Sequence, residues 1–143
     1  MMARQVLLCI LAASCVLVSC KRILPMRPEL GIKLESAGSD YVVSFTNCLN
    51  DQPLPIDEVG IYKNGDGPRG LPALCELVST QYGQHVLNSW TYGTTPPGYR
   101  LGKCAAMSTG ETYEIHASGS GDGVRRFQLQ NGGEVKALEP VCR

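Results

Sequence analysis

Cysteine and histidine are the side chains of this chain best suited to covalent or metal chemistry. No two cysteines have the C-x₂-C spacing of a zinc site, and neither histidine lies near a cysteine in the sequence. We therefore expect no metal site and no cofactor. Three cysteines fall in the first twenty residues, and four are spread along the rest; the latter and the two histidines are Cys48, Cys75, Cys104, Cys142, His85 and His116.

The first twenty residues have the order of a secretory signal peptide. Arg4 supplies a positive charge, Val6–Val18 is an apolar and small-residue run, and small residues follow it. A bilayer core needs roughly 20 apolar residues as a helix, so the run is too short for a transmembrane span. The alternative, a buried N-terminal helix, does not account for this order. We expect residues 1–19 to be removed on export.

The end of this segment, Leu17-Val18-Ser19-Cys20, resembles the lipobox of bacterial lipoproteins. The resemblance implies that Cys20 becomes the first mature residue and carries diacylglycerol and palmitate-type acyl chains. Two or three chains anchor a protein stably where one is marginal. In such lipoproteins an aspartate after the cysteine favours the inner membrane, and Lys21 stands there instead. The expected location is the outer membrane, facing the periplasm.

The four remaining cysteines form an even set in an exported domain, which indicates two disulfides. Four cysteines allow three pairings, and the sequence alone does not select among them. We predict Cys48–Cys75 and Cys104–Cys142.

The sequence gives little sign of catalysis. It lacks the G-x-S-x-G and H-E-x-x-H motifs. Asp57 and Glu58 are adjacent, so on a strand they point to opposite faces. The glycine-rich stretch 118–123 lacks both the lysine of a phosphate loop and the several acids of a calcium loop, and we interpret it as a hairpin connection. We expect a protein that is not an enzyme.

The elements that position these residues are predicted to be strands. Residues 20–30, with the lipidated cysteine and two prolines, form a tether, and residues 31–143 form one domain. Short alternating apolar runs are separated by turn residues such as Asn131-Gly132, and no helical periodicity persists. This spacing favours an all-β sandwich. The predicted strands are 32–34, 41–45, 59–63, 74–78, 86–92, 113–117, 125–130 and 135–138.

One strand narrows the fold class. Residues 107–117 place an apolar residue, a glycine and Tyr113 at the spacing of the tyrosine corner, and they resemble the penultimate strand of fibronectin type III and immunoglobulin-like domains. The resemblance implies that the Tyr113 ring is buried and that its hydroxyl bonds upstream backbone. Alternation places Ile115 inward and His116 outward. We predict an immunoglobulin-like antiparallel sandwich of about seven to nine strands.

An aromatic stretch, residues 90–99, allows two interpretations. Trp90 and Tyr92 share one strand face, and Tyr99 follows a proline-glycine turn. These rings can fill the core of a small sandwich. They can instead form an exposed recognition patch for a protein partner. We name Trp90, Tyr92 and Tyr99 as candidate partner-binding residues and leave both alternatives open.

The pattern W-x-Y-G-x-x-P-x-G-Y in this stretch, followed by M-x-x-G-x-x-Y, resembles a group of small proteobacterial lipoproteins. Lipoproteins of similar layout, with a Tyr-Lys-Asn-Gly-Asp-like strand end such as residues 62–66, include proposed immunity proteins against type VI secretion toxins. The resemblance implies a domain that captures a protein partner.

The charge balance fits a domain that binds a protein. Without the signal peptide, the chain has twelve basic and thirteen acidic side chains, so it has no excess of positive charge and we expect no nucleic-acid binding. The first hypothesis is a protein-binding module in the periplasm, such as an immunity protein that neutralises a secreted toxin. The alternatives are a structural envelope lipoprotein without a discrete ligand and a small hydrolase with a dispersed site.

Overall fold

The computed structural model describes residues 26–63, 67–69 and 72–143, so the predicted signal peptide and Cys20 lie outside the described residues. Nine strands and one short 3₁₀ helix, η1 (Gly67–Arg69), make up the regular structure of this part. The strands are β1 (Leu30–Ala37), β2 (Asp40–Asn47), β3 (Ile56–Lys63), β4 (Cys75–Ser79), β5 (Ser89–Thr91), β6 (Tyr99–Leu101), β7 (Thr112–Gly119), β8 (Asp122–Leu129) and β9 (Val135–Ala137).

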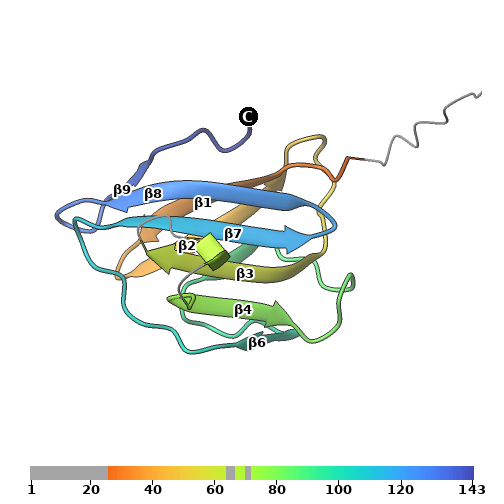
Figure 1. The fold of residues 1–143 in the computed structure, drawn as a ribbon, viewed down its shortest axis with the longest axis horizontal. Helices are drawn as coiled ribbons and strands as arrows, with labels where there is room; N and C mark the ends of the chain where they lie inside the picture. Colours follow the sequence, from red (N-terminus) through yellow and green to blue (C-terminus); the bar gives the residue numbers. More distant parts are fainter. Residues whose placement is uncertain (1–25, 64–66, 70–71) are drawn as a thin grey trace, which may run out of the picture.

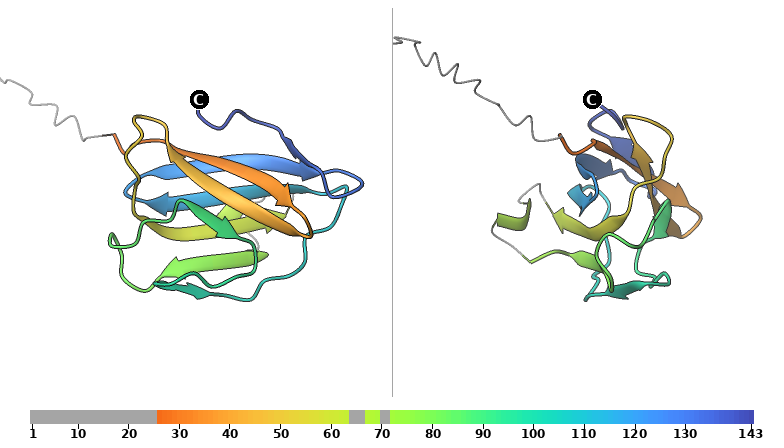
Figure 2. Two further views of the ribbon diagram at one scale, coloured as in Figure 1. Left: turned by 180° about the vertical axis from the view of Figure 1, so that it is seen from behind. Right: turned by 90° about the vertical axis from the view of Figure 1, so that its right-hand side faces the viewer.

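The strands form two antiparallel sheets that pack face to face. One has three strands in the order β1-β2-β5, and the other has six in the order β6-β4-β3-β7-β8-β9. The left view of Figure 2 shows β1 and β2 crossing in front of the larger sheet, and Figure 1 shows them behind it. The prediction of an immunoglobulin-like all-β sandwich is confirmed. In the described residues no helix is long and apolar enough to span a membrane.

The core lies between the sheets and follows the alternation of apolar residues. On β7, Tyr113, Ile115 and Ala117 are buried, as predicted, whereas Glu114 and His116 lie on the outer face. Val59 and Ile61 of β3 join them. One strand, β6, was not predicted, because only three residues after the turn at Gly98 pair with β4.

The tyrosine corner is present. The Tyr113 ring is buried, and the Ser108 N–H donates a hydrogen bond of 2.7 Å to its hydroxyl oxygen. The hydroxyl thus fixes the segment that leads into β7, as the resemblance to fibronectin type III domains implies.

Removing this hydroxyl should destabilise the domain. Tyr113→Phe leaves the Ser108 N–H without its partner, and we expect a loss of about 1–3 kcal/mol in the free energy of unfolding. Urea denaturation measures it. Tyr82→Phe is the control, because Tyr82 is exposed and its hydroxyl makes no hydrogen bond in the described structure. Equal effects of the two substitutions would contradict the assignment.

Two glycines of the 118–123 stretch are required by close packing of backbones. A Cβ atom at Gly123 would lie 2.0 Å from the Leu30 carbonyl oxygen, and one at Gly119 would lie 2.3 Å from that of Pro55. The stretch is a hairpin connection, as predicted, but only Ser120 and Gly121 lie outside the strands. Gly119 of β7 lets the backbone at Pro55 pass directly against its strand, and Gly123 of β8 does the same for the backbone at Leu30.

Candidate functional site

The four cysteines of the described residues are all in disulfides, but the predicted pairing is wrong. The bonds are Cys48–Cys142, with Cα atoms 5.6 Å apart, and Cys75–Cys104, with Cα atoms 4.1 Å apart. The C-terminal segment returns past β1 to the end of β2, which brings Cys142 to Cys48. Cys75 is the first residue of β4. The chain after β6 runs beside it, where the Ala105 N–H donates to the Leu74 carbonyl oxygen at 3.0 Å, and this brings Cys104 to Cys75.

The aromatic stretch belongs mainly to the core, which is the first of the two alternatives that the sequence left open. Trp90 and Tyr99 are buried, and Tyr92 is half-buried. The Trp90 indole N–H donates to the Thr94 carbonyl oxygen at 2.9 Å, and the Tyr92 hydroxyl donates to that of Ala105 at 2.5 Å. Burial raises the pKa values of Tyr92 and Tyr99 to about 12. Trp90 and Tyr99 thus belong to the core between the sheets, and Tyr92 packs against it.

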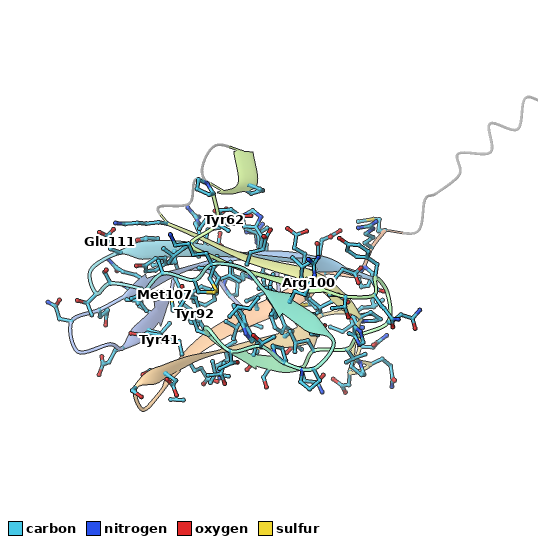
Figure 3. All side chains as sticks on the ribbon, turned by 90° about the horizontal axis from the view of Figure 1, so that it is seen from below. Tyr41, Tyr62, Tyr92, Arg100, Met107 and Glu111 are labelled. Atoms are coloured by element: carbon cyan, nitrogen blue, oxygen red, sulfur yellow. A yellow bond between two sulfur atoms is a disulfide. The ribbon has the colours of Figure 1, made fainter. Side chains whose placement is uncertain are left out.

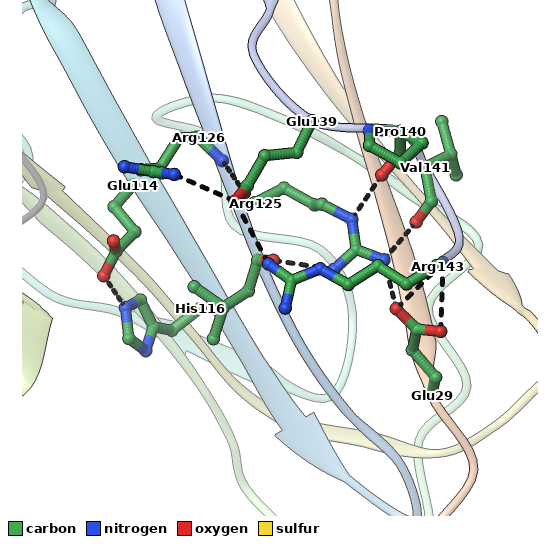
Figure 4. Close-up of polar contacts among 10 residues, drawn as sticks. Glu29, Glu114, His116, Arg125, Arg126, Glu139, Pro140, Val141 and Arg143 are labelled. Atoms are coloured by element: carbon green, nitrogen blue, oxygen red, sulfur yellow. Dashed lines mark hydrogen bonds and ion pairs between the residues drawn. The ribbon is translucent and has the colours of Figure 1, made fainter.

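The structure contains a polar cluster, centred on Arg125, that the sequence interpretation missed. The Arg125 side chain is buried, pairs with Glu29, and donates to the carbonyl oxygens of Pro140 and Val141, each at 2.6 Å (Figure 4). The backbone N–H of Arg143 also bonds the Glu29 carboxylate. This cluster, with the adjacent Cys48–Cys142 bond, fixes the C-terminal segment against β1. Its role is structural.

The acids of this cluster have lowered pKa values. The hydrogen bond from Arg125 is the main cause for Glu29, and it outweighs the opposing effect of burial. At Glu139, burial raises the pKa, but the hydrogen bonds and charge of Arg126 together outweigh it, and the pKa lies below its ordinary value. Both carboxylates therefore remain charged at neutral pH and hold the C-terminal segment by charge-assisted hydrogen bonds.

The outer face of the six-stranded sheet carries a groove of about 240 Å³, here called the outer-face groove. Figure 1 shows η1 lying over the same face, in front of β3 and β7. Figure 3 labels Tyr62 on the side that carries η1. The lining residues come from β3, η1, β7 and β8 and are Glu58, Gly60, Tyr62, Pro68, His116, Ala117, Ser118, Asp122, Gly123 and Val124.

Strand register brings these residues together. Gly60 of β3 is opposite His116 of β7, and His116 is opposite Val124 of β8. Because Gly60 has no side chain, the Tyr62 ring lies over it: a Cβ atom there would be 2.8 Å from the ring. The Tyr62 and His116 rings meet edge to face, with centroids 5.2 Å apart. The Tyr62 and His116 rings thus form one side of the groove, next to small residues such as Gly60.

The groove is bordered by acids. Glu58 and Asp122 line it, and Glu114 bonds the Nε2 atom of His116. A second hollow on the other side of Tyr62 includes Glu76. Burial, with smaller contributions from the charges of Glu58 and Glu76, raises the pKa of Tyr62. Its hydroxyl therefore stays protonated at neutral pH and can donate a hydrogen bond.

This arrangement suits binding of a cation or a hydrogen-bond acceptor. Carboxylates attract a positive group, whereas the Tyr62 ring is buried and contributes packing rather than an open surface. Within residues 26–63, 67–69 and 72–143, no three His, Cys, Asp or Glu side chains gather as metal ligands. Ser118 shares the outer face with His116, yet no hydrogen bond joins their side chains in the described structure. His85 lies elsewhere, with its ring 5.7 Å from that of Tyr99.

Comparison of the chain with protein-family models, with curated protein sequences and with solved structures gives no match. The function is therefore argued from the residues and geometry described above.

Proposed function

We propose that this protein is an exported lipoprotein, anchored through Cys20 to the periplasmic face of the outer membrane, and that its sandwich binds a protein partner. The lipobox-like sequence and Lys21 support the anchor and its location. The single observation that supports binding is the outer-face groove. It contains a buried tyrosine, Tyr62, against a partly exposed histidine, His116, on a sheet face where solvated side chains would suffice for folding.

The partner's chemistry follows from the groove. Its acidic border, which includes Glu58 and Asp122, favours a basic segment of the partner. Aromatic side chains in partly enclosed sites are frequent centres of binding energy in protein interfaces. The resemblance to proposed immunity lipoproteins makes a secreted toxin the partner to examine first. Neutralisation then occurs by occupation of a toxin surface.

A binding role accounts for the site better than a catalytic one. His116 is the only histidine of the groove, and Glu114 occupies its Nε2 atom. A nucleophile activated by this histidine needs a hydrogen bond to it, and Ser118 makes none in the described structure. The pair Glu114–His116 therefore serves in this proposal to hold the imidazole against Tyr62.

The anchor is tested by metabolic labelling with radioactive palmitate. The wild-type chain should be labelled and should fractionate with the outer membrane, and Cys20→Ala should lose the label. Cys15→Ala is the matched control, because Cys15 lies in the segment that is removed. Label that persists in Cys20→Ala, or a wild-type chain without label, would refute the anchor.

The binding proposal is tested by comparing the proteins that copurify with the full-length chain from the envelope. Glu58→Lys places a positive charge at the groove, whereas Glu35→Lys makes the same change on the exposed outer face of β1. We expect at least one partner to be reduced about tenfold or more, equivalent to about 1.4 kcal/mol, by Glu58→Lys alone. Partners unaffected by Glu58→Lys would favour the alternative, a structural lipoprotein without a discrete ligand.

A further inference from the structure

Four of the six exposed large apolar side chains of the described residues belong to segments at one end of the sandwich. Met26, Leu49, Tyr82 and Val86 are 91 %, 77 %, 70 % and 47 % exposed. Leu49 belongs to the β2–β3 connection, and Tyr82 and Val86 to the β4–β5 connection. Figure 1 shows both connections at the right-hand end, where the described chain also begins. We call this the tether end.

The tether end is held in place by backbone hydrogen bonds. The Cys48 N–H donates to the Glu29 carbonyl oxygen at 3.0 Å, and the Ile56 N–H donates to that of His85 at 2.9 Å. Pro55 and Val86 form an isolated bridge. Met26 and Leu49 line one shallow groove. The apolar side chains thus project from segments whose backbones are fixed to the sandwich.

The length of chain before the tether end brings it close to the proposed anchor. Met26 is six residues after Cys20, and six extended residues span about 20 Å at most. The chain is bonded to the sandwich from Pro28 onward, because the Pro28 carbonyl oxygen accepts from the Asp122 N–H at 3.3 Å. If Cys20 is in the bilayer, the tether end is the part of the domain nearest to it.

We propose that the tether end rests on the phospholipid surface and places Met26, Leu49, Tyr82 and Val86 in the headgroup layer. This inference rests on the proposed lipid anchor. Tyrosine is favoured at membrane–water interfaces because its ring is apolar and its hydroxyl polar. Four exposed apolar side chains bind lipid weakly by themselves, but a short tether raises their effective concentration at the surface to the millimolar range.

Apolar contact, rather than charge, drives this binding of the tether end to the phospholipid surface, which we call the seating. Arg27 is at the tether end, but Asp122 pairs with it at 3.4 Å, and Asp51 and Asp57 lie in the same region. A surface with both signs is not attracted strongly to anionic lipid. Seating should therefore depend little on salt concentration. It leaves the outer-face groove on the flank of the domain, open to the periplasm.

The test uses the full lipidated chain in vesicles of phosphatidylethanolamine and phosphatidylglycerol with brominated acyl chains, which quench nearby tryptophan. Leu49→Trp and Tyr82→Trp place reporters at the tether end. Ser39→Trp is the matched control, because Ser39 is exposed in the β1–β2 turn at the opposite end. The native Trp90 is buried in every variant and supplies a constant background.

We expect brominated lipid to reduce the added fluorescence of Leu49→Trp and Tyr82→Trp and to leave that of Ser39→Trp unchanged, at low and at high salt. Equal quenching at all three positions, or none at the tether end, would overturn the seating. Flotation of the protein with the vesicles reports the anchor separately. A chain that floats but shows uniform quenching refutes the seating alone, and a chain that does not float refutes both proposals.

Discussion

Arg125→Met should lower the free energy of unfolding by about 3 kcal/mol, near the lower end of the range for breaking a buried ion pair. Methionine fills much of the space, but it removes the ion pair with Glu29 and leaves the carbonyl oxygens of Pro140 and Val141 without the Arg125 donor. The effect is not larger because about a third of the Glu29 side chain reaches solvent. Urea denaturation at neutral pH measures the change.

The neighbouring arginine supplies a control for this substitution. Arg126 pairs with Glu139 at 3.1 Å, but its side chain is half-exposed. Exposed ion pairs contribute about 1 kcal/mol or less, so Arg126→Met should have a small effect. Equal losses for the two arginines would show that burial of Arg125 does not matter to stability.

The effect of Arg125→Met should also depend on pH. Arg125 lowers the pKa of Glu29 below its ordinary value of 4.5, so the charged form is the one that stabilises the fold. This contribution is fully present above the ordinary pKa and is lost as the pH falls through the lowered one. The difference in stability between wild type and Arg125→Met should therefore shrink below about pH 4.5. A difference that stays constant into acid would contradict the pairing.

Removal of the Cys48–Cys142 disulfide should be the most destabilising change in the chain. The bond joins residues 94 apart, and Cys75–Cys104 joins residues 29 apart. In the chain-entropy model these loops correspond to about 4.7 and about 3.6 kcal/mol. We expect the double variant Cys48→Ala/Cys142→Ala to lose more stability than Cys75→Ala/Cys104→Ala, as measured by urea denaturation.

The two double variants control for each other, because each removes one bond and leaves the other. A larger loss for Cys75→Ala/Cys104→Ala would contradict the loop argument. Peptide mapping of the unreduced wild-type protein checks the pairing itself. A peptide that links Cys48 to Cys75 would restore the pairing expected from the sequence and refute the one described here.

The fold was predictable because its information is local. Alternation on the strand at Tyr113, Ile115 and Ala117 and turn signals such as Asn131-Gly132 require only neighbouring residues. The same alternation also indicated that Arg125 is buried, which the sequence analysis did not use. It places Arg125 in phase with the inward Phe127 and Leu129, and a buried arginine requires a partner.

The remaining features depend on residues that are far apart in sequence. The disulfide pairing follows from the return of the C-terminal segment past β1, which no local pattern encodes. The groove was half predictable, since alternation places His116 on the outer face. Its contact with Tyr62 depends on the register between β3 and β7 and on the missing side chain at Gly60, which lets the Tyr62 ring lie there. The core position of Trp90 likewise depends on the pairing of β5 with β2.

The most direct test of the account is site-specific photocrosslinking in intact cells that produce the full-length protein. A photoreactive amino acid at Val124 lies in the outer-face groove, and one at Lys33 lies exposed on β1 of the other sheet. We expect a discrete protein adduct from Val124 that Glu58→Lys abolishes, and none from Lys33. Adducts of equal yield at the two positions, or no adduct at Val124, would contradict a partner-binding role for the groove.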